Sequence, residues 1–229
     1  MKNQFVFGGV YQKLIALVVC LIAFAGCGKK TCDSQPSALV TTVDLWPDPD
    51  NIPVCWINPE GASDAVRKSL QDHLAEEYGE KTSVTFVGFE KCTESQMTEA
   101  VIRVFIRKDA KFGSGRSLVG AKKGIGVLPH GGTMELSVPT NWPRRGDTWR
   151  KKKVMYATLH EFGHALGLRH EHLREDAHSC KHATGVPPEN SRPVGEYDTV
   201  SVMNYCSKSR TFRLSEGDVA GVEALYGKL

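Results

Sequence analysis

The sequence lacks a long hydrophobic run, a long basic run and an internal repeat. Its clearest apolar stretch, LIALVVCLIAFA, has twelve residues, whereas a helix that crosses a bilayer needs about 20. The net charge is only +3, and the densest basic stretch, Arg150–Lys153, is short and fits a solvated helix start. The sequence therefore gives no case for a transmembrane helix or for a nucleic-acid partner.

The first residues contain a targeting pattern instead, because lysines precede an apolar stretch that fits a secretory signal. FAGC at residues 24–27 resembles a bacterial lipobox, which implies a signal peptide over residues 1–26 and a lipid on Cys27. AFA at residues 23–25 also fits an ordinary cut that would release a soluble, secreted protein. Under both interpretations the chain is exported from the cytoplasm. The first anchors it to the cell envelope, and Gly28 after the lipidated cysteine favours the outer membrane.

Cysteine is sparse, with seven residues in the chain, of which one leaves with the signal and Cys27 is the lipidation candidate. An exported protein can keep disulfides. The other five are Cys32, Cys55, Cys92, Cys180 and Cys206. An odd number leaves at least one thiol without an intrachain partner. We expect Cys55 to pair with Cys92 and Cys180 to pair with Cys206, although spacing alone does not fix the connectivity.

The length of 229 residues and the hydrophobic content of 41% suffice for one core, which two lobes can share. Residues 27–50 carry three prolines and little periodicity, so they are predicted to form a tether. A single domain is then expected over residues 51–229. Its upper lobe would span about 51–167 and its lower lobe about 168–229.

Hydrophobic periodicity predicts an alternation of strands and helices in this domain. Branched and aromatic runs favour strands, and apolar residues at helical spacing favour helices. The closing segment has Ser215 and Asp218 in the spacing of a capping box. The predicted strands are 52–58, 83–89, 100–107 and 132–138, and the predicted helices are 62–79, about 147–168 and the segment after Ser215.

The segment TLHEFGHALGLRHEH holds four of the eight histidines in the chain. His160 and His164 lie four residues apart, so on a helix they share one face and can bind one zinc ion. Glu161 projects beside that ion and can hold a water and accept its proton. Gly167 tolerates the turn that ends the helix and lets His170 return as the third ligand. Three histidine ligands leave one position open, which is the pattern of a catalytic zinc site.

The motif H-E-x-x-H-x-x-G-x-x-H resembles the zinc motif of the metzincin metallopeptidases. SVMNY at residues 201–205 is similar to the methionine-containing turn of that family, with Met203 packing beneath the metal and not binding it. The segment HEHLRED and the S-x-M-x-Y form look most like the astacins, in which a glutamate follows the third histidine, as Glu171 does here. The resemblance implies that Tyr205 can bind zinc and then stabilise the oxyanion.

The sequence departs from the astacin pattern in three places. Asn204 stands where astacins usually have histidine, and no long inhibitory propeptide can be located. The predicted tether also leaves open whether Glu171 pairs with a freed amino terminus. The chain therefore resembles an astacin-like bacterial branch of the metzincins and does not match the full astacin pattern.

Other polar residues receive weaker interpretations. Three further histidines could bind a second metal, but a solvated loop is the favoured interpretation. They are His172, His178 and His182. His130 is expected in a loop before strand 132–138. By resemblance that strand is the sheet edge that pairs with an extended substrate through main-chain hydrogen bonds.

These observations and the resemblance predict an α/β (α+β) protein with a metzincin-like zincin fold. A twisted mixed sheet with the active-site helix would lie above a smaller, irregular C-terminal lobe. The expected function is a monomeric zinc endopeptidase with one zinc per chain, a peptide or protein substrate, and membrane contact only through its lipid. Two alternatives stay open: a zinc hydrolase of a non-peptide bond, and a zinc-binding lipoprotein without turnover.

Overall fold

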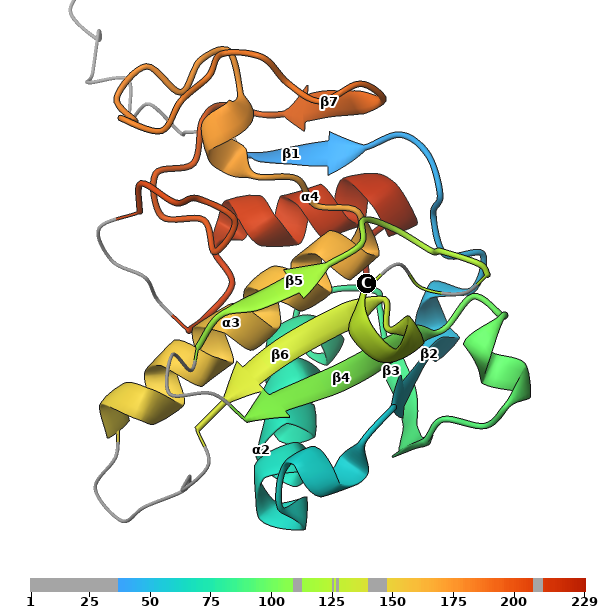
Figure 1. The fold of residues 1–229 in the computed structure, drawn as a ribbon. Helices are drawn as coiled ribbons and strands as arrows, with labels where there is room; N and C mark the ends of the chain where they lie inside the picture. The colour runs from blue at the N-terminus through green and yellow to red at the C-terminus, as the bar shows by residue number, and fades with distance from the viewer. Residues whose placement is uncertain (1–36, 109–112, 125, 127, 140–147, 208–211) are drawn as a thin grey trace, which may run out of the picture. The chain divides into compact units, whose positions relative to one another are not determined.

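The structure of the chain is a computed structural model that describes residues 37–108, 113–124, 126, 128–139, 148–207 and 212–229 (Figure 1). The predicted signal peptide, the lipidation candidate Cys27 and the odd cysteine Cys32 lie outside the described residues. Within the described part of the chain, no helix is long and apolar enough to cross a membrane.

The larger of two sheets has five strands in the order β3–β2–β4–β6–β5 (Figure 1). β2 runs parallel to both β3 and β4, β4 runs parallel to β6, and β5 is antiparallel to β6. This arrangement confirms the predicted mixed sheet. The strands are β2 Ile52–Trp56, β3 Phe86–Lys91, β4 Ile102–Lys108, β5 Gly115–Ser117 and β6 Met134–Val138.

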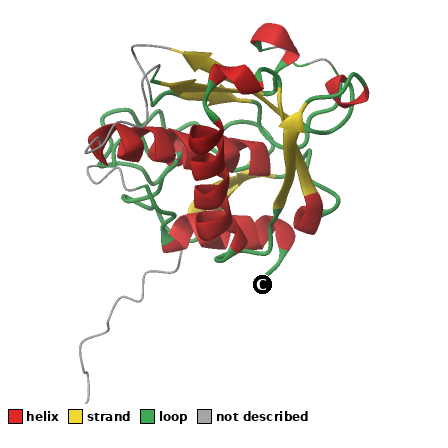
Figure 2. Ribbon diagram, turned by 90° about the horizontal axis from the view of Figure 1, so that it is seen from below, coloured by secondary structure: helices red, strands yellow, loops and turns green. Residues whose placement is uncertain are grey.

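Two helices pack beside this sheet, as Figure 2 shows with helices in red and strands in yellow. α2, Asp64–Leu74, begins at Ser63, whose side chain accepts a hydrogen bond from Val66 N, and continues into a π turn at Ala75–Gly79. α3, Thr148–Leu166, contacts α2, β5 and β6. Short 3-10 turns lie at Pro49–Asn51, Pro59–Gly61, Ser95–Met97, Pro129–Gly131 and Glu171–Leu173.

The remaining elements form the smaller lobe. β1, Ala38–Thr41, pairs antiparallel with β7, Ser191–Val194, and α4, Glu216–Tyr226, packs against both strands. Ser215 and Asp218 form the predicted capping box at the start of α4. Most of the described chain between α3 and α4 has no regular secondary structure, so the prediction of an irregular lobe is confirmed.

The predicted tether is wrong for its second half. Leu39, Val40 and Trp46 are almost fully buried in the domain. The backbone N–H of Arg169 donates to Leu39 O at 2.7 Å, which ties β1 to the chain just after α3. β1 has only four residues and all four are buried, so it shows no alternation that could have marked it as a strand.

The predicted edge strand is also wrong. Strand 132–138 corresponds to β6, which lies between β4 and β5, so the edge of the sheet on this side is β5. β5 has three residues and sits in the sequence GSGRS, whose glycines and serines predict a loop. Pairing with β6, and not intrinsic strand propensity, holds these residues extended.

Two disulfides join distant parts of the chain. Cys55 in β2 is bonded to Cys92, one residue after β3, and Cys180 is bonded to Cys206 within the smaller lobe. These are the two pairs expected from the sequence. The second disulfide ends at the residue that follows Tyr205, so it restrains the segment that carries this tyrosine.

Candidate active site

The three histidines of the motif meet at the end of α3. His160 and His164 share the face of α3 that points toward the smaller lobe, and the turn at Gly167, with φ of +108°, brings His170 back to them. The Nε2 atom of His170 lies 3.2 Å from that of His160 and 3.0 Å from that of His164. Three nitrogens held at 2.0–2.1 Å from one tetrahedral ion are about 3.3 Å apart. The spacing therefore fits a metal ion bound by all three.

The other ring nitrogens of the two helical histidines are used to orient the rings. His160 Nδ1 lies 2.8 Å from Val202 O, and His164 Nδ1 lies 2.8 Å from Leu168 O. A carbonyl can only accept, so each Nδ1 carries the proton and donates it. Each Nε2 then presents its lone pair to the shared centre, and metal-binding histidines usually donate their other ring N–H in this way to a carbonyl or carboxylate.

The charge state of the rings also suits a cation. Burial lowers the pKa of His160 to about 4 and the pKa of His170 to about 3, and it lowers the pKa of His164 well below its ordinary value. The three rings are therefore neutral at pH 7, as a metal requires of imidazole ligands. Among the described residues, these three form the only group of histidines, cysteines and carboxylates close enough to hold a metal ion.

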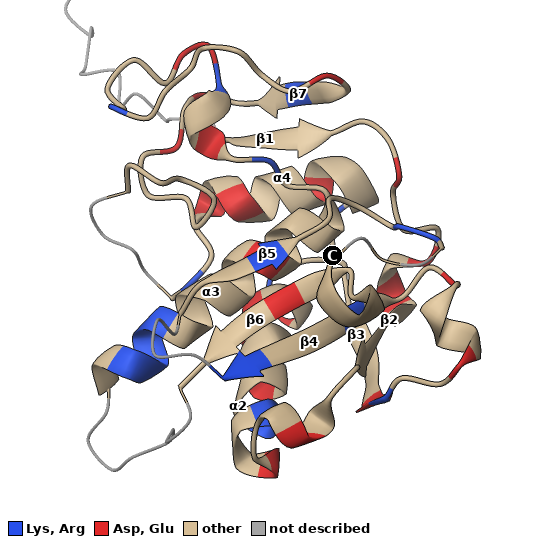
Figure 3. Ribbon diagram, viewed as in Figure 1, with Lys and Arg blue, Asp and Glu red and all other residues tan. Residues whose placement is uncertain are grey.

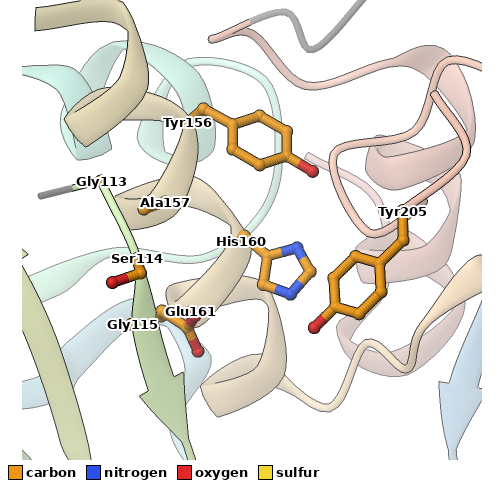
Figure 4. Close-up of a pocket in the computed structure, with 8 residues that line it drawn as sticks. All are labelled: Gly113, Ser114, Gly115, Tyr156, Ala157, His160, Glu161 and Tyr205. Atoms are coloured by element: carbon orange, nitrogen blue, oxygen red, sulfur yellow. The ribbon is translucent and has the colours of Figure 1, made fainter. Parts of the chain in front are cut away.

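Glu161 lies beside the histidines in a pocket of about 190 Å³ (Figure 4). Only 5% of the residue is exposed, and burial raises the pKa of its carboxyl to about 8. The wall opposite α3 is formed by Gly113, Ser114 and Gly115. A Cβ atom at Gly115 would lie 2.5 Å from Glu161 Cγ, so only glycine lets β5 lie this close to the carboxylate.

Tyr205 enters the same pocket from the smaller lobe (Figure 4). Its ring centroid is 5.6 Å from that of His160 and 4.4 Å from that of His170. The side chain is 46% exposed, and burial, followed by the Glu161 charge, raises the pKa of the phenol. Tyr205 is therefore protonated at neutral pH and can donate a hydrogen bond into the pocket.

The turn before Tyr205 lies beneath α3. A Cβ atom at Gly163 would come within 2.8 Å of Met203 Sδ, so the thioether packs directly under the helix. The buried carboxylate of Asp218 holds this turn: it accepts from Ser201 Oγ at 2.6 Å and from Val202 N at 3.0 Å. Asp218 therefore fixes the residue whose carbonyl orients His160. The sequence suggested Asp218 only as a helix cap and gave no signal for this second role.

Glu171 and Asn204 occupy buried positions behind the histidines. Glu171 Oε1 accepts from Asp198 N at 3.0 Å, whereas Oε2 has no partner among the described residues. Burial raises the pKa of Glu171 to about 8. Asn204 Nδ2 donates to Tyr197 Oη and to Asp198 O, both at 2.8 Å. Both residues brace the loop that carries Tyr205.

The remaining histidines do not join the metal-binding group. His172 is buried and stacks on Tyr205 with a centroid distance of 4.5 Å, while His178 and His182 are exposed. His130 lies in the turn before β6 and stacks on Phe105 at 4.2 Å. Gly113, Ser114 and Tyr156 also line the pocket. The sequence analysis did not single them out, because these residue types are common in ordinary loops and on helix surfaces.

Comparison with known proteins gives a structural match. Myroilysin superposes with a TM-score of 0.56 at 19% identity, covering 83% of this chain and 99% of myroilysin. The chain has the fold of myroilysin. The zinc-protease high choriolytic enzyme 1, a hatching enzyme of the medaka fish Oryzias latipes, gives a TM-score of 0.48 at 18% identity, covering 81% and 96%. No protein-family model and no curated protein matches the sequence.

Proposed function

We propose that the protein is a zinc-dependent endopeptidase. The observation that carries this proposal is the convergence of three neutral imidazole Nε2 atoms beside the buried carboxylate of Glu161. A closed structural zinc site would need a fourth strong ligand. Among the described residues no other histidine, cysteine or carboxylate belongs to the group. The donor set therefore fits one catalytic zinc per chain, held by His160, His164 and His170.

When bound, zinc would polarise the carbonyl of the scissile bond and lower the pKa of a water molecule at the site. Glu161 is the proton acceptor in this proposal. Its burial gives the carboxylate a higher proton affinity than an ordinary glutamate, which suits proton transfer near neutral pH. Glu161 takes the proton from the attacking water and passes it to the nitrogen that leaves.

Tyr205 is proposed to stabilise the negative charge that develops on the carbonyl oxygen. Its phenol lies across the pocket from Glu161 and is protonated, so it can donate a hydrogen bond to that oxygen. Met203 supports the site from below and takes no part in proton transfer. The Cys180–Cys206 disulfide limits how far the Tyr205 segment can move.

The substrate is proposed to bind as an extended strand along β5. This replaces the sequence-based assignment of the same role to strand 132–138. β5 is the edge of the sheet, and Gly115 places it directly beside Glu161. Main-chain hydrogen bonds to an added strand give affinity without requiring a particular side chain of the substrate.

The test of this proposal compares the zinc-loaded wild-type protein, begun after Cys27, with Glu161→Ala. We expect both to hold one zinc per chain, and we expect cleavage of unfolded casein to fall at least about a hundredfold in the variant. Glu175→Ala removes an exposed carboxylate outside the pocket and should leave cleavage unchanged. Turnover retained by Glu161→Ala would refute the mechanism. Hydrolysis of small esters with no cleavage of casein would favour a non-peptide substrate.

We also propose that the chain is exported and carries a lipid on Cys27. The two disulfides fit an oxidising compartment, and FAGC at residues 24–27 supplies the lipidation pattern. Cells that express the protein should incorporate labelled fatty acid into it, and Cys27→Ser should abolish the label. An unlabelled wild-type protein in the medium would favour the soluble, secreted alternative.

A further inference from the structure

The ring of Tyr205 lies against other rings in the pocket. The side chain is 46% exposed, so burial alone does not fix its position. Segment 201–207 has no charged residue, and the lysines and arginines of α3 gather at its start, away from the histidines near its end (Figure 3). The neighbours that hold the ring are three imidazoles, with centroids 5.6, 4.4 and 4.5 Å away, which belong to His160, His170 and His172.

Of these three imidazoles, only that of His172 has no part in the proposed chemistry. The residue is 5% exposed and does not belong to the metal-binding group. Its plane makes an angle of 22° with the ring of Tyr205 and an angle of 26° with the ring of His170, and the centroid of His170 is 5.0 Å away. His172 is therefore stacked on both neighbours.

The backbone fixes the two stacked residues relative to each other. Glu171 N donates to Met203 O at 3.1 Å, so the turn that carries His172 is tied to the turn that carries Tyr205. The side chain of Glu171 also accepts from Asp198 N at 3.0 Å. Neither bond involves the imidazole of His172, so replacing that ring should leave the two turns in place.

The contact uses the face of the imidazole. The Nδ1 atom of His172 is buried and has no hydrogen-bond partner among the described residues. A buried polar atom without a partner destabilises a fold, and a phenyl ring offers a similar flat face without that atom. His172→Phe should therefore preserve the contact with Tyr205, whereas His172→Ala removes it.

We propose that His172 is a positioning residue, whose stacked ring holds Tyr205 in the pocket (Figure 4). This inference rests on the proposed endopeptidase function, in which the hydroxyl of Tyr205 donates to the developing oxyanion. A ring that is already held in place loses less conformational freedom when it makes this hydrogen bond. Because the bond forms only in the transition state, its loss lowers kcat and leaves KM nearly unchanged.

The first test measures kcat and KM of the zinc-loaded protein with a fluorogenic peptide. We expect kcat to fall about three- to tenfold in His172→Ala, which is the effect of one lost aromatic contact, and to stay within about twofold of the wild type in His172→Phe. His172→Leu fills the space without a flat ring and should be as slow as His172→Ala. It carries the same test if the alanine variant does not fold.

His130→Ala is the matched control. It also removes a stacked histidine, because His130 lies on the ring of Phe105 at a centroid distance of 4.2 Å, but neither residue lines the pocket. Its kcat should equal that of the wild type. His172→Ala with the kcat of the wild type would overturn the proposal, and so would His172→Phe as slow as His172→Ala.

A double-mutant cycle separates positioning from general packing. Tyr205→Phe keeps the ring and removes the hydroxyl. In that background His172→Ala should change kcat less than about twofold, because no hydroxyl is left to be placed. An equal loss in both backgrounds would mean that His172 only stabilises the fold around the pocket, and it would overturn the proposal.

Fluorine NMR of the purified protein labelled with 3-fluorotyrosine reads the stack without any measurement of activity. The resonance that disappears in Tyr205→Phe belongs to Tyr205, and it should move toward the position of free fluorotyrosine in His172→Ala but not in His130→Ala. If the wild type cuts no peptide, the proposed function fails, and the resonance then decides this inference alone. A Tyr205 signal that His172→Ala leaves in place overturns it.

Discussion

At the scale of single residues, burial has opposite effects on the two kinds of side chain in the pocket. It keeps the three histidines neutral and raises the pKa of Glu161. Both shifts have the same first cause, which is that burial removes the groups from water and so disfavours the charged form of either sign. A bound divalent cation supplies positive charge and favours the ionised form of a nearby carboxylate. The residues around the pocket therefore complement a cation that must be added to the chain.

Asp218 offers a residue-scale prediction. Asp218→Ala removes the acceptor of Ser201 Oγ and Val202 N, so the Val202 carbonyl is no longer held against His160. We expect zinc affinity to fall about 10- to 100-fold, as is usual when an outer-shell partner is lost. Competition with a chromogenic chelator measures the affinity. Glu223→Ala, on the same helix but away from the turn, should bind zinc like the wild type.

The histidine motif was predictable, because spacing along one helix converts directly into geometry. The helical repeat alone places His160 and His164 on one face of the helix. A glycine at position 167 predicts a turn with positive φ, which the structure has. The second role of Asp218 was not predictable. It depends on a hydrogen bond between residues 16 positions apart that approach only in the folded chain. Likewise, no local pattern places Tyr156 in the pocket, since its exposure depends on where β5 lies.

At the scale of elements, β5 can lie close to α3 because Gly115 has no side chain. Gly115→Ala should force β5 and Glu161 apart, because the new Cβ would lie 2.5 Å from Glu161 Cγ and 2.7 Å from Glu135 O. We expect casein cleavage to fall at least about tenfold while the zinc content stays at one per chain. A Cβ at Gly79 meets nothing within 4 Å, so Gly79→Ala is the control. Equal activity of both variants would contradict the close approach of β5 to the site.

The helix α2 carries a buried histidine that makes stability depend on pH. Burial lowers the pKa of His73 below 6.5, and this effect outweighs the opposing charges of Glu77 and Glu76, while Arg213 and Lys151 add to it. The folded chain then binds fewer protons than the unfolded chain, so this stability is lost as the pH falls through 6.5. The Tm of His73→Gln should therefore fall less than that of the wild type between pH 7.5 and 5.5.

The control for this prediction is His178→Gln, which replaces an exposed histidine. Its Tm should follow the wild-type dependence on pH. Parallel curves for the wild type and His73→Gln would mean that His73 takes up no extra proton on unfolding in this range.

Element prediction succeeded where an element has a periodic pattern of its own. The strands at 52–58 and 100–107 and the helix at 62–79 correspond to β2, β4, and α2 with its π turn. The short strands β1, β5 and β7 were missed. β1 is buried throughout, β5 lies among glycines, and β7 contains a proline. Pairing with a neighbouring strand holds these segments extended. Because that neighbour is distant in the sequence, no pattern within the segment itself predicts the strand.

At the scale of the whole domain, the carboxyl end of α3 is where the two lobes meet. Trp46 Nε1 donates to Ala165 O at 2.7 Å, and Tyr226 Oη donates to Leu166 O at 2.7 Å. The last carbonyls of a helix lack partners within it. Here they are satisfied by a residue from the start of the domain and one from its end. The histidine pair just before these carbonyls is therefore anchored by both termini of the domain.

This arrangement predicts where the domain begins. A chain begun at residue 51, the boundary favoured by sequence, lacks the buried side chains of Leu39, Val40 and Trp46. At about 1.5–3 kcal/mol each, the loss of these three side chains removes about 4.5–9 kcal/mol from a total stability of about 5–15 kcal/mol. Arg174 also loses the Ala38 carbonyl as an acceptor. We expect a chain begun at residue 35 to melt cooperatively by near-ultraviolet circular dichroism, and the chain begun at residue 51 to show no such transition. Equal melting curves would mean that β1 is dispensable and that the tether extends to residue 50.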